Sequence, residues 1–499
     1  MKNFKNKKKM LMLATLLTGA MSFGGGASIV SAATSAQTIA QASQMQRASI
    51  SELDNDTRVF KVDKTIEAKN VRFQNRYGFE VAGHLYLPKN FDASKQYKAV
   101  VVTGPFGAVK EQSSGLYAQE MAKNGYVALA FDPSMTGESS GERRNMGSPD
   151  IFTEDYHAAV DFVSNLTFVN PNEIGAIGIC GLSGMAITAA GSDSRIKAVA
   201  TSAMYDMSES ISDHYKGAYY TPEQRDKVLE HLAQMRDREA KTGTSIRGAH
   251  ELGVDAQGNI QTFDVMFPDQ LPEGADSVST EFYNYYIGRA YHPRAINSNT
   301  SAWDSTTAYG FFDFNLMDNI TELGNKPVLL ITGDKAHSKY FSDDVYAKLT
   351  TPNKREIVVP GATHTDLYDQ TDKIPFAELV AFFNKNLWLI RHPNRKDSAP
   401  FPERRRSPSI WKGLSYEEIY CHHRCECGHR LCDCEEIRGW GQEYHRPGAA
   451  YRSPRGAEKW NSRGISERWC HHPLPWSVWD AGDRGTVRGT FRLFSWDMD

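Results

Sequence analysis

Short apolar runs alternate with segments of helical spacing between residues 97 and 387, and this alternation limits the possible folds most strongly. The apolar runs lie at 97–103, 126–132, 174–179, 196–203, 326–333 and 355–361. The helical spacing lies at 114–125, 150–166, 184–192, 341–350 and 375–387. Strands that are apolar on both faces are typical of a parallel sheet covered by helices on both sides. We therefore predict an α/β fold with a mostly parallel, doubly wound sheet.

The interval 207–323 interrupts the alternation between two of the predicted strands. It is rich in Tyr, Phe, Asp and Ser and contains helical pieces such as residues 221–242. An insertion at this place in the chain is expected to form a helical cap over the functional site of the domain 56–387. The alternative is an insertion without a functional role.

Residues 1–32 have the composition of a secretory signal peptide. Five Lys residues precede an apolar stretch, and small residues at Val30-Ser31-Ala32 suit cleavage after Ala32. An uncleaved anchor is the alternative, but Gly24 to Gly26 would weaken a spanning helix. No later segment reaches the ~20 apolar residues that a membrane crossing needs. We predict an exported protein without a membrane span, in which residues 33–55 form a polar linker.

Residues 388–499 differ in composition from the rest of the chain. Six of the seven Cys residues lie between Cys421 and Cys470, and Arg largely replaces Lys. A disordered tail, a tail translated out of frame and a metal-binding module are the three interpretations. The spacing lacks the paired C-x₂-C pattern of zinc folds, so we favour an out-of-frame tail and predict no metal site.

The charge of the body argues against a nucleic-acid partner. The chain has a net charge of −3, although the segments 1–32 and 388–499 are both basic. Residues 33–387 are therefore acidic, whereas phosphate binding requires clustered Lys and Arg.

The stretch GICGLSGMA at 178–186 joins an apolar run to a helix of small residues. A strand that ends in G-x-nucleophile-x-G and leads directly into a helix is the nucleophile elbow of α/β hydrolases. Cys180 and Ser183 are both candidates for the nucleophile. Cys180 follows Gly178 by two residues and keeps the strand at its expected length, whereas Ser183 requires a longer strand. We predict Cys180 as the nucleophile.

The general base is expected after the last strand, where the sequence GATHTDLYD supplies His364. The acid that orients it usually lies in the loop after the preceding strand. In the common G-x-x-D pattern this position holds Ala336. We predict Asp334 as the acid. Asp206 is the alternative, and a Cys–His pair without an acid is a further alternative.

Two backbone N–H groups are expected to hold the oxyanion of an acyl transition state. The first is that of Gly181, directly after the nucleophile. The second comes from the turn after residues 99–103. Because Pro105 has no N–H, Phe106 or Gly107 must supply it, and Phe106 is the prediction.

Taken together, GPFGAVKEQSSGLYAQEMAKNGYVALAFDPSMTGESSGE, GICGLSGMA, GDKAHSKYFSDD and GATHTDLYD resemble bacterial α/β hydrolases related to dienelactone hydrolases. The resemblance covers residues 60–387 and implies an α/β-hydrolase fold with a cysteine at the elbow. It also implies hydrolysis of an ester or related acyl bond of a small molecule, without a cofactor. Leu182 and Ser183 depart from that family's elbow, which has glycines soon after the cysteine. A catalytically inactive binding protein with the same fold is the alternative function.

Overall fold

The computed structural model describes residues 48–53, 57–216 and 220–387 of the 499-residue chain. The predicted signal peptide 1–32 and the tail 388–499, with its six Cys residues, lie outside these ranges. Among the helices in these ranges, none has the length and apolar character that crossing a bilayer requires.

Nine strands form one sheet in the order β1-β2-β3-β5-β4-β6-β7-β10-β11. The pairs from β5 to β11 in this order are parallel, and the pairs that join β1, β2, β3 and β5 are antiparallel. The strands are β1 (Ala48–Ser51), β2 (Glu67–Gln74), β3 (Glu80–Leu87), β4 (Tyr97–Thr103), β5 (Val127–Phe131), β6 (Val169–Ile179), β7 (Ile196–Ser202), β10 (Val328–Gly333) and β11 (Lys354–Val359). The predicted mostly parallel sheet is confirmed.

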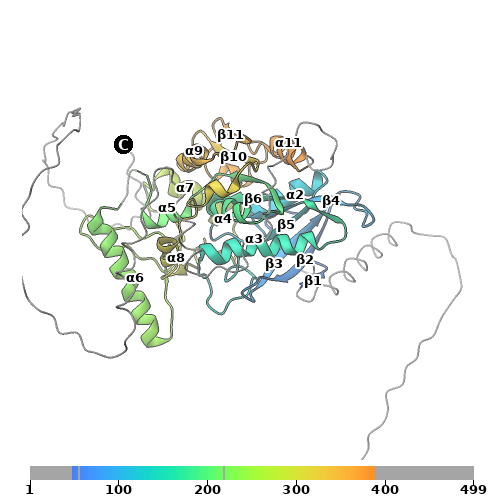
Figure 1. The fold of residues 1–499 in the computed structure, drawn as a ribbon. Coiled ribbons are helices and arrows are strands. Elements are labelled where there is room, and N and C mark those ends of the chain that lie inside the picture. The colour runs from blue at the N-terminus through green and yellow to red at the C-terminus, as the bar shows by residue number, and fades with distance from the viewer. Residues whose placement is uncertain (1–47, 54–56, 217–219, 388–499) are drawn as a thin grey trace, which may run out of the picture. The chain divides into compact units, whose positions relative to one another are not determined.

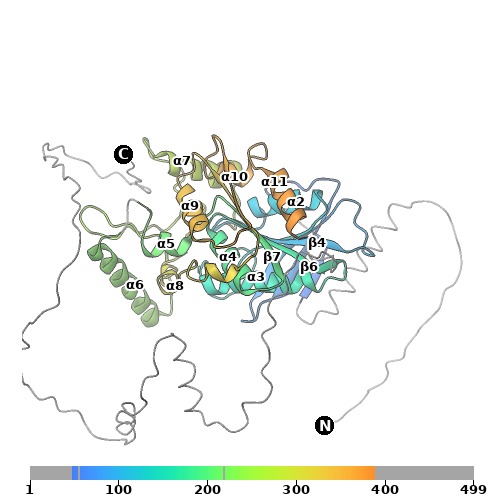
Figure 2. The same ribbon diagram turned by 45° about the horizontal axis from the view of Figure 1, so that its top comes forward.

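Helices cover both faces of this sheet (Figures 1 and 2). A Cβ atom on Gly175 of β6 would clash with the ring of Phe383, and one on Gly178 would lie 2.6 Å from the Cα atom of Ser183. These glycines are three residues apart and therefore face opposite sides of the sheet. The covering helices are α2 (Ser113–Lys123), α3 (Pro149–Ser164), α4 (Ser183–Ser192), α9 (Lys339–Lys348) and α11 (Phe376–Asn386). The sheet is thus doubly wound, with α11 on one face of β6 and α4 on the other.

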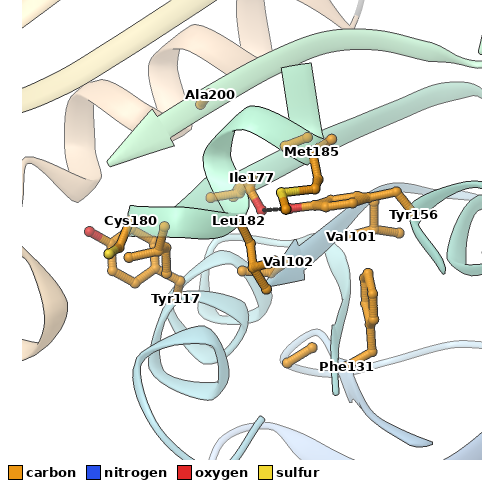
Figure 3. Packing of buried hydrophobic residues seen from close by; sticks show 14 of the residues in the cluster. Val101, Val102, Tyr117, Phe131, Tyr156, Ile177, Cys180, Leu182, Met185 and Ala200 are labelled. Atoms are coloured by element: carbon orange, nitrogen blue, oxygen red, sulfur yellow. Dashed lines mark hydrogen bonds between the residues drawn. The ribbon is translucent and has the colours of Figure 1, made fainter. Parts of the chain in front are cut away.

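The core beneath the end of β6 is closely packed, as Figure 3 shows. Four apolar side chains, each at most 1% exposed, pack near Tyr156 of α3: Val101, Val102, Phe131 and Ile177. The Tyr156 hydroxyl donates a hydrogen bond to the Ile177 carbonyl at 3.1 Å. Burial of so much apolar surface fixes the position of β6, and with it the turn that follows this strand.

The predicted linker 33–55 contains a strand, so its description as a linker is wrong for residues 48–51. β1 pairs antiparallel with β2, and Ile50 is 6% exposed. One buried apolar side chain in a strand of four residues gives too short an alternation to recognise from sequence. The part at 33–47 lies outside the described residues.

The elements between β7 and β10 fall within the predicted insertion 207–323, which we call the cap. They are α5 (Met207–Ser212), α6 (Pro222–Thr242), β8 (Arg247–Gly248), α7 (Ser277–Tyr283), a π-helical turn (Asn284–Arg289), β9 (Trp303–Asp304), α8 (Ala308–Asp313) and a 3₁₀ turn (Ile320–Leu323). The longest, α6, begins with a capping box between Thr221 and Gln224 and ends at Gly243, whose φ is 68°. These are the start and stop signals expected of an exposed helix.

Candidate active site

Cys180 lies in the sharp turn between β6 and α4. Its φ is +55°, a left-handed conformation that residues other than glycine rarely adopt. Such strain is typical of the nucleophile elbow, where it holds one side chain above the carboxyl ends of the strands. Gly178 and Gly181 make the turn possible, because a Cβ on Gly181 would lie 2.6 Å from the Cβ of Phe106.

Ser183, the other candidate in the turn, is the first residue of α4 and has no exposed surface. Its hydroxyl oxygen is buried without a hydrogen-bond partner among the protein atoms. Cys180 lines a pocket, whereas Ser183 is not among the residues of its wall. The turn therefore presents Cys180 to the pocket and buries Ser183 where α4 packs against β6.

The pocket above Cys180 is mostly apolar, and the cap supplies most of its wall. Its lining comprises Phe106, Cys180, Tyr205, Met207, His250, Glu251, Met266, Phe267, Leu271, Ser279, Phe282, Tyr286 and Asn297. Apolar pockets with a few polar groups are the usual form of a small-molecule site. The cap therefore provides most of the surface that a molecule bound beside the cysteine would contact.

Both predicted oxyanion donors lie beside the sulfur of Cys180. The backbone N–H groups of Gly181 and Phe106 lie beside Sγ and act to lower the pKa of the thiol. The cap holds this loop in place, because Asn297 Nδ2 donates to the Phe106 carbonyl at 2.8 Å and the N–H of Ile296 donates to the Gly107 carbonyl at 2.8 Å. Of the two residues considered from sequence, Phe106 is thus the one that approaches Cys180.

A buried cluster of charged side chains lies next to the loop that contains Phe106 and Gly107, which we call the oxyanion loop. Lys110 is 1% exposed and forms ion pairs with Glu111, Asp132 and Glu138 at 2.8, 3.1 and 2.9 Å. Arg294 of the cap joins the cluster through Glu111 at 2.6 Å. Removing one partner of such a group would leave uncompensated buried charge, so the cluster ties the oxyanion loop to the end of β5 and to the cap.

His364 lies in the loop after β11 and is fully buried. Its Nδ1 lies 2.5 Å from Ser338 Oγ, and its Nε2 lies 2.7 Å from the hydroxyl of Tyr368. The same tyrosine hydroxyl lies beside the Cys180 thiol and acts to lower the pKa of that thiol. Tyr368, on the short helix α10 (Asp366–Asp369), therefore connects the cysteine to the histidine.

Neither predicted acid contacts His364, and the prediction of Asp334 is wrong. The Asp334 side chain is exposed, and its carboxylate accepts a hydrogen bond from the N–H of Gly361 at 2.6 Å. Asp206 instead caps α5, where it accepts hydrogen bonds from Ser208 and Glu209. The position facing Nδ1 belongs to Ser338, two residues after the Ala336 that replaces the expected acid.

A second histidine lies directly beside the first. The rings of His337 and His364 are 4.9 Å apart between centroids. His337 Nδ1 lies 3.1 Å from a carboxylate oxygen of Glu281, on α7 of the cap, and its Nε2 lies 2.6 Å from the hydroxyl of Tyr205. The carboxylate in this region thus pairs with His337 rather than with His364.

The resting cysteine and histidine are both neutral. Burial raises the pKa of the Cys180 thiol to about 12, although hydrogen bonds from Tyr368, Gly181 and Phe106 favour the thiolate. Burial and the neighbouring His337 hold the pKa of His364 well below its usual value. The pair is therefore a thiol with an imidazole, and not a preformed thiolate–imidazolium pair.

Alkylation of Cys180 is expected to be slow at neutral pH and to accelerate steadily with pH. Because the thiolate reacts and the thiol pKa is raised, the rate should rise about tenfold per pH unit from pH 7 to 9. At pH 7 it should be at least about 100-fold below that of an ordinary exposed cysteine. Iodoacetamide labelling, followed by mass spectrometry of the peptide that contains Cys180, measures this. A fast rate that is constant between pH 6 and 8 would contradict the neutral pair.

Comparison with known proteins identifies the family. The sequence pattern of the X-Pro dipeptidyl-peptidase (S15) family matches residues 78–321. Uncharacterized protein PA2218 from Pseudomonas aeruginosa is 46% identical over 331 residues, which is 66% of this chain and 84% of that protein. The crystal structure of PA2218 has 44% identity and a TM-score of 0.61, and the match covers 68% of this chain and 99% of that one. The chain belongs to the S15 family of α/β hydrolases.

Two further relatives extend the comparison. Uncharacterized protein YcjY from Escherichia coli is 31% identical over 315 residues, or 61% of this chain and 93% of that protein. Thiohydrolase aneE from Aspergillus aculeatus is 34% identical over 129 residues, or 26% of this chain and 39% of that protein. The S15 match supports the predicted hydrolase class, while the closer relation to dienelactone hydrolases stays a prediction.

Within the described ranges of this S15-family chain, no group of three or more His, Cys, Asp or Glu side chains is arranged to hold a metal ion. The cysteine-rich stretch considered from sequence lies in the tail, outside those ranges.

Proposed function

We propose that this protein is a cysteine-dependent acyl hydrolase that cleaves an ester or thioester of a small molecule through an acyl-enzyme on Cys180. The observation that carries the proposal is the contact chain from Cys180 through Tyr368 to His364, next to the N–H groups of Gly181 and Phe106. One relative is named a thiohydrolase, which favours a thioester as the substrate. The predicted relation to dienelactone hydrolases favours an oxygen ester.

Acylation begins with the transfer of two protons. The Cys180 thiol gives its proton to the Tyr368 oxygen while the phenol gives its own to His364 Nε2. The sulfur attacks the carbonyl carbon, and the resulting oxyanion accepts hydrogen bonds from the N–H groups of Gly181 and Phe106. Each such donor typically contributes about 10²–10³ in rate. The tetrahedral intermediate then expels the alcohol or thiol, which takes the proton back from His364 along the same route.

Deacylation repeats these steps with water as the nucleophile. His364 accepts a proton from water, directly or through Tyr368, and hydroxide adds to the thioester carbonyl. Collapse of this second intermediate releases the carboxylic acid and restores the thiol. Ser338 is suited to accept a hydrogen bond from His364 Nδ1–H, which leaves Nε2 free to act as the base. A serine hydroxyl stabilises the imidazolium less than a carboxylate does, so substrates with good leaving groups are favoured.

A panel of four substrates tests the proposal: a p-nitrophenyl ester, an alkyl ester, an N-acetylcysteamine thioester and an X-Pro p-nitroanilide. We expect the purified protein to turn over the activated ester and the thioester, and to cleave the anilide least, because an aniline is the poorest leaving group of the set. Turnover confined to the anilide would reject an ester or thioester hydrolase. Absence of all turnover, together with tight substrate binding, would favour the inactive binding protein.

We further propose that the protein is exported, because residues 1–32 have the order of charge, apolar stretch and small residues that signal peptidases recognise. N-terminal sequencing of the protein recovered outside the cytoplasm tests this proposal. The expected first residue is Ala33, and an intact Met1 start in the cytoplasmic fraction alone would reject it.

A further inference from the structure

A single carboxyl group lines the mostly apolar pocket above Cys180. Glu251 follows β8 in the cap and is 7% exposed. Its Oε1 accepts a hydrogen bond from the Ser210 hydroxyl. When ionised, it raises the pKa of both Cys180 and Tyr205. The carboxyl group therefore belongs to the same cavity as the reacting sulfur. The mechanism described above does not use it.

Among the described residues, no Lys or Arg side chain forms an ion pair with this carboxyl group. The nearest ion-pair partner is His250, whose Nε2 lies 4.0 Å from Glu251 Oε1. Burial lowers the pKa of His250 to about 3, so this imidazole is neutral. Burial also raises the pKa of Glu251 to about 7. Below neutral pH, the pair is thus largely a neutral carboxyl group beside a neutral imidazole.

The two side chains have hydrogen-bonding capacity that the protein does not use. His250 lines the same pocket, and its Nδ1 is buried without a hydrogen-bond partner among the protein atoms. Much of the remaining wall offers only apolar contacts, from Met207, Met266, Phe267, Leu271 and Phe282. Placing polar groups in such a wall costs stability unless they acquire partners. A ligand that supplies the partner removes this cost when it binds.

We propose that Glu251 and His250 form a polar subsite for a hydroxyl group on the acyl chain of the substrate. A hydroxyl suits this pair because it can donate to one group and accept from the other. A plain hydrocarbon chain would leave His250 Nδ1 without a partner and add none to the Ser210 hydroxyl at Glu251. An ammonium group would require an ionised carboxylate in an apolar wall. The preferred substrates are therefore esters or thioesters of hydroxylated fatty acids. This proposal rests on the proposed acyl chemistry at Cys180.

Binding to an inactive variant tests the subsite independently of turnover. The Cys180→Ala protein is titrated by calorimetry with N-acetylcysteamine thioesters of hexanoic, 3-hydroxyhexanoic, 6-hydroxyhexanoic and 6-aminohexanoic acid. At least one hydroxyacyl thioester should bind at least tenfold more tightly than the hexanoyl thioester. Adding Glu251→Leu should reduce this ratio to about one, since a site built for a hydrogen bond discriminates strongly against a ligand that lacks it. Glu251→Gln, which keeps a donor and an acceptor, should retain part of the preference.

Glu154→Gln is the matched control, because Glu154 is equally buried but lies on α3 and not in the pocket wall. It should leave the ratio unchanged. Equal affinity for the plain and hydroxylated chains, preference for the aminoacyl thioester, or equal loss of all ligands in both Glu251 variants would each overturn the subsite. In the active protein, kcat/KM should show the same preference. If binding shows it while the active protein has no Cys180-dependent turnover, the proposed hydrolase function fails and the subsite stands.

Discussion

Replacing Cys180 with alanine is expected to lower kcat/KM for activated esters and thioesters by at least about a thousandfold, because no other nucleophile lies in the pocket wall at this turn. The fold should survive, since the substitution removes one sulfur atom from a residue whose backbone the sheet and α4 already hold. Steady-state kinetics with a p-nitrophenyl ester measures the loss. Circular dichroism and the melting temperature verify that the variant is folded.

Ser183→Ala provides the matched control in the same turn. The Ser183 hydroxyl is buried without a partner, so its removal should change kcat/KM by no more than about twofold and should not destabilise the protein. The opposite pattern, with full activity in Cys180→Ala and loss in Ser183→Ala, would transfer the nucleophile to the serine. It would also require α4 to begin later than it does in this structure.

The second large effect is expected at Tyr368. Tyr368→Phe removes the hydroxyl that joins Cys180 to His364 and should lower kcat by about 100-fold, within the range of a lost general acid–base contact. The solvent isotope effect separates a proton carrier from a structural residue. The wild type should show a curved dependence on the deuterium fraction, which indicates two protons in motion, and Tyr368→Phe should show a linear one.

Two variants control for the loss of a polar group near the site. Tyr285 is also buried, and its ring lies 4.8 Å from that of Tyr368, but its hydroxyl accepts a hydrogen bond from the N–H of Ser113 at 3.2 Å and has none with His364. Tyr285→Phe should keep the curved isotope dependence. Asp334→Ala should keep activity within about threefold, because surface substitutions away from a site have small effects. Unchanged or increased kcat in Tyr368→Phe would mean that His364 receives the proton from Cys180 directly.

The route from β6 through Cys180 to α4 could be predicted because local rules decide it. Strand length, the position of Gly178 and the onset of the small-residue helix all favour the same residue. The place of His364 after the last strand follows from chain order in the same way. Gly181 and Phe106 followed from the need for N–H donors and from the absence of one in Pro105.

The contacts of His364 could not be predicted from chain order. The usual acid position holds Ala336, and the histidine instead contacts Ser338 and Tyr368, which are ordinary residues in the sequence. One signal was available for Tyr368: it follows His364 by four residues, a spacing that brings two side chains to the same face of a helical turn. The pairing of His337 with Glu281 depends on how the cap folds over the sheet, which no local pattern determines.

The central claim is that substrate carbon becomes bonded to Cys180. Rapid mixing with a slowly deacylating aryl ester, acid quenching and proteolysis would place the acyl group on one peptide, and fragmentation would place it on one atom. The account predicts an acyl adduct on Cys180 that forms within the first turnover, decays at the steady-state rate and is absent from Cys180→Ala. Turnover with the adduct on Ser183, or with no adduct on either residue, would contradict it.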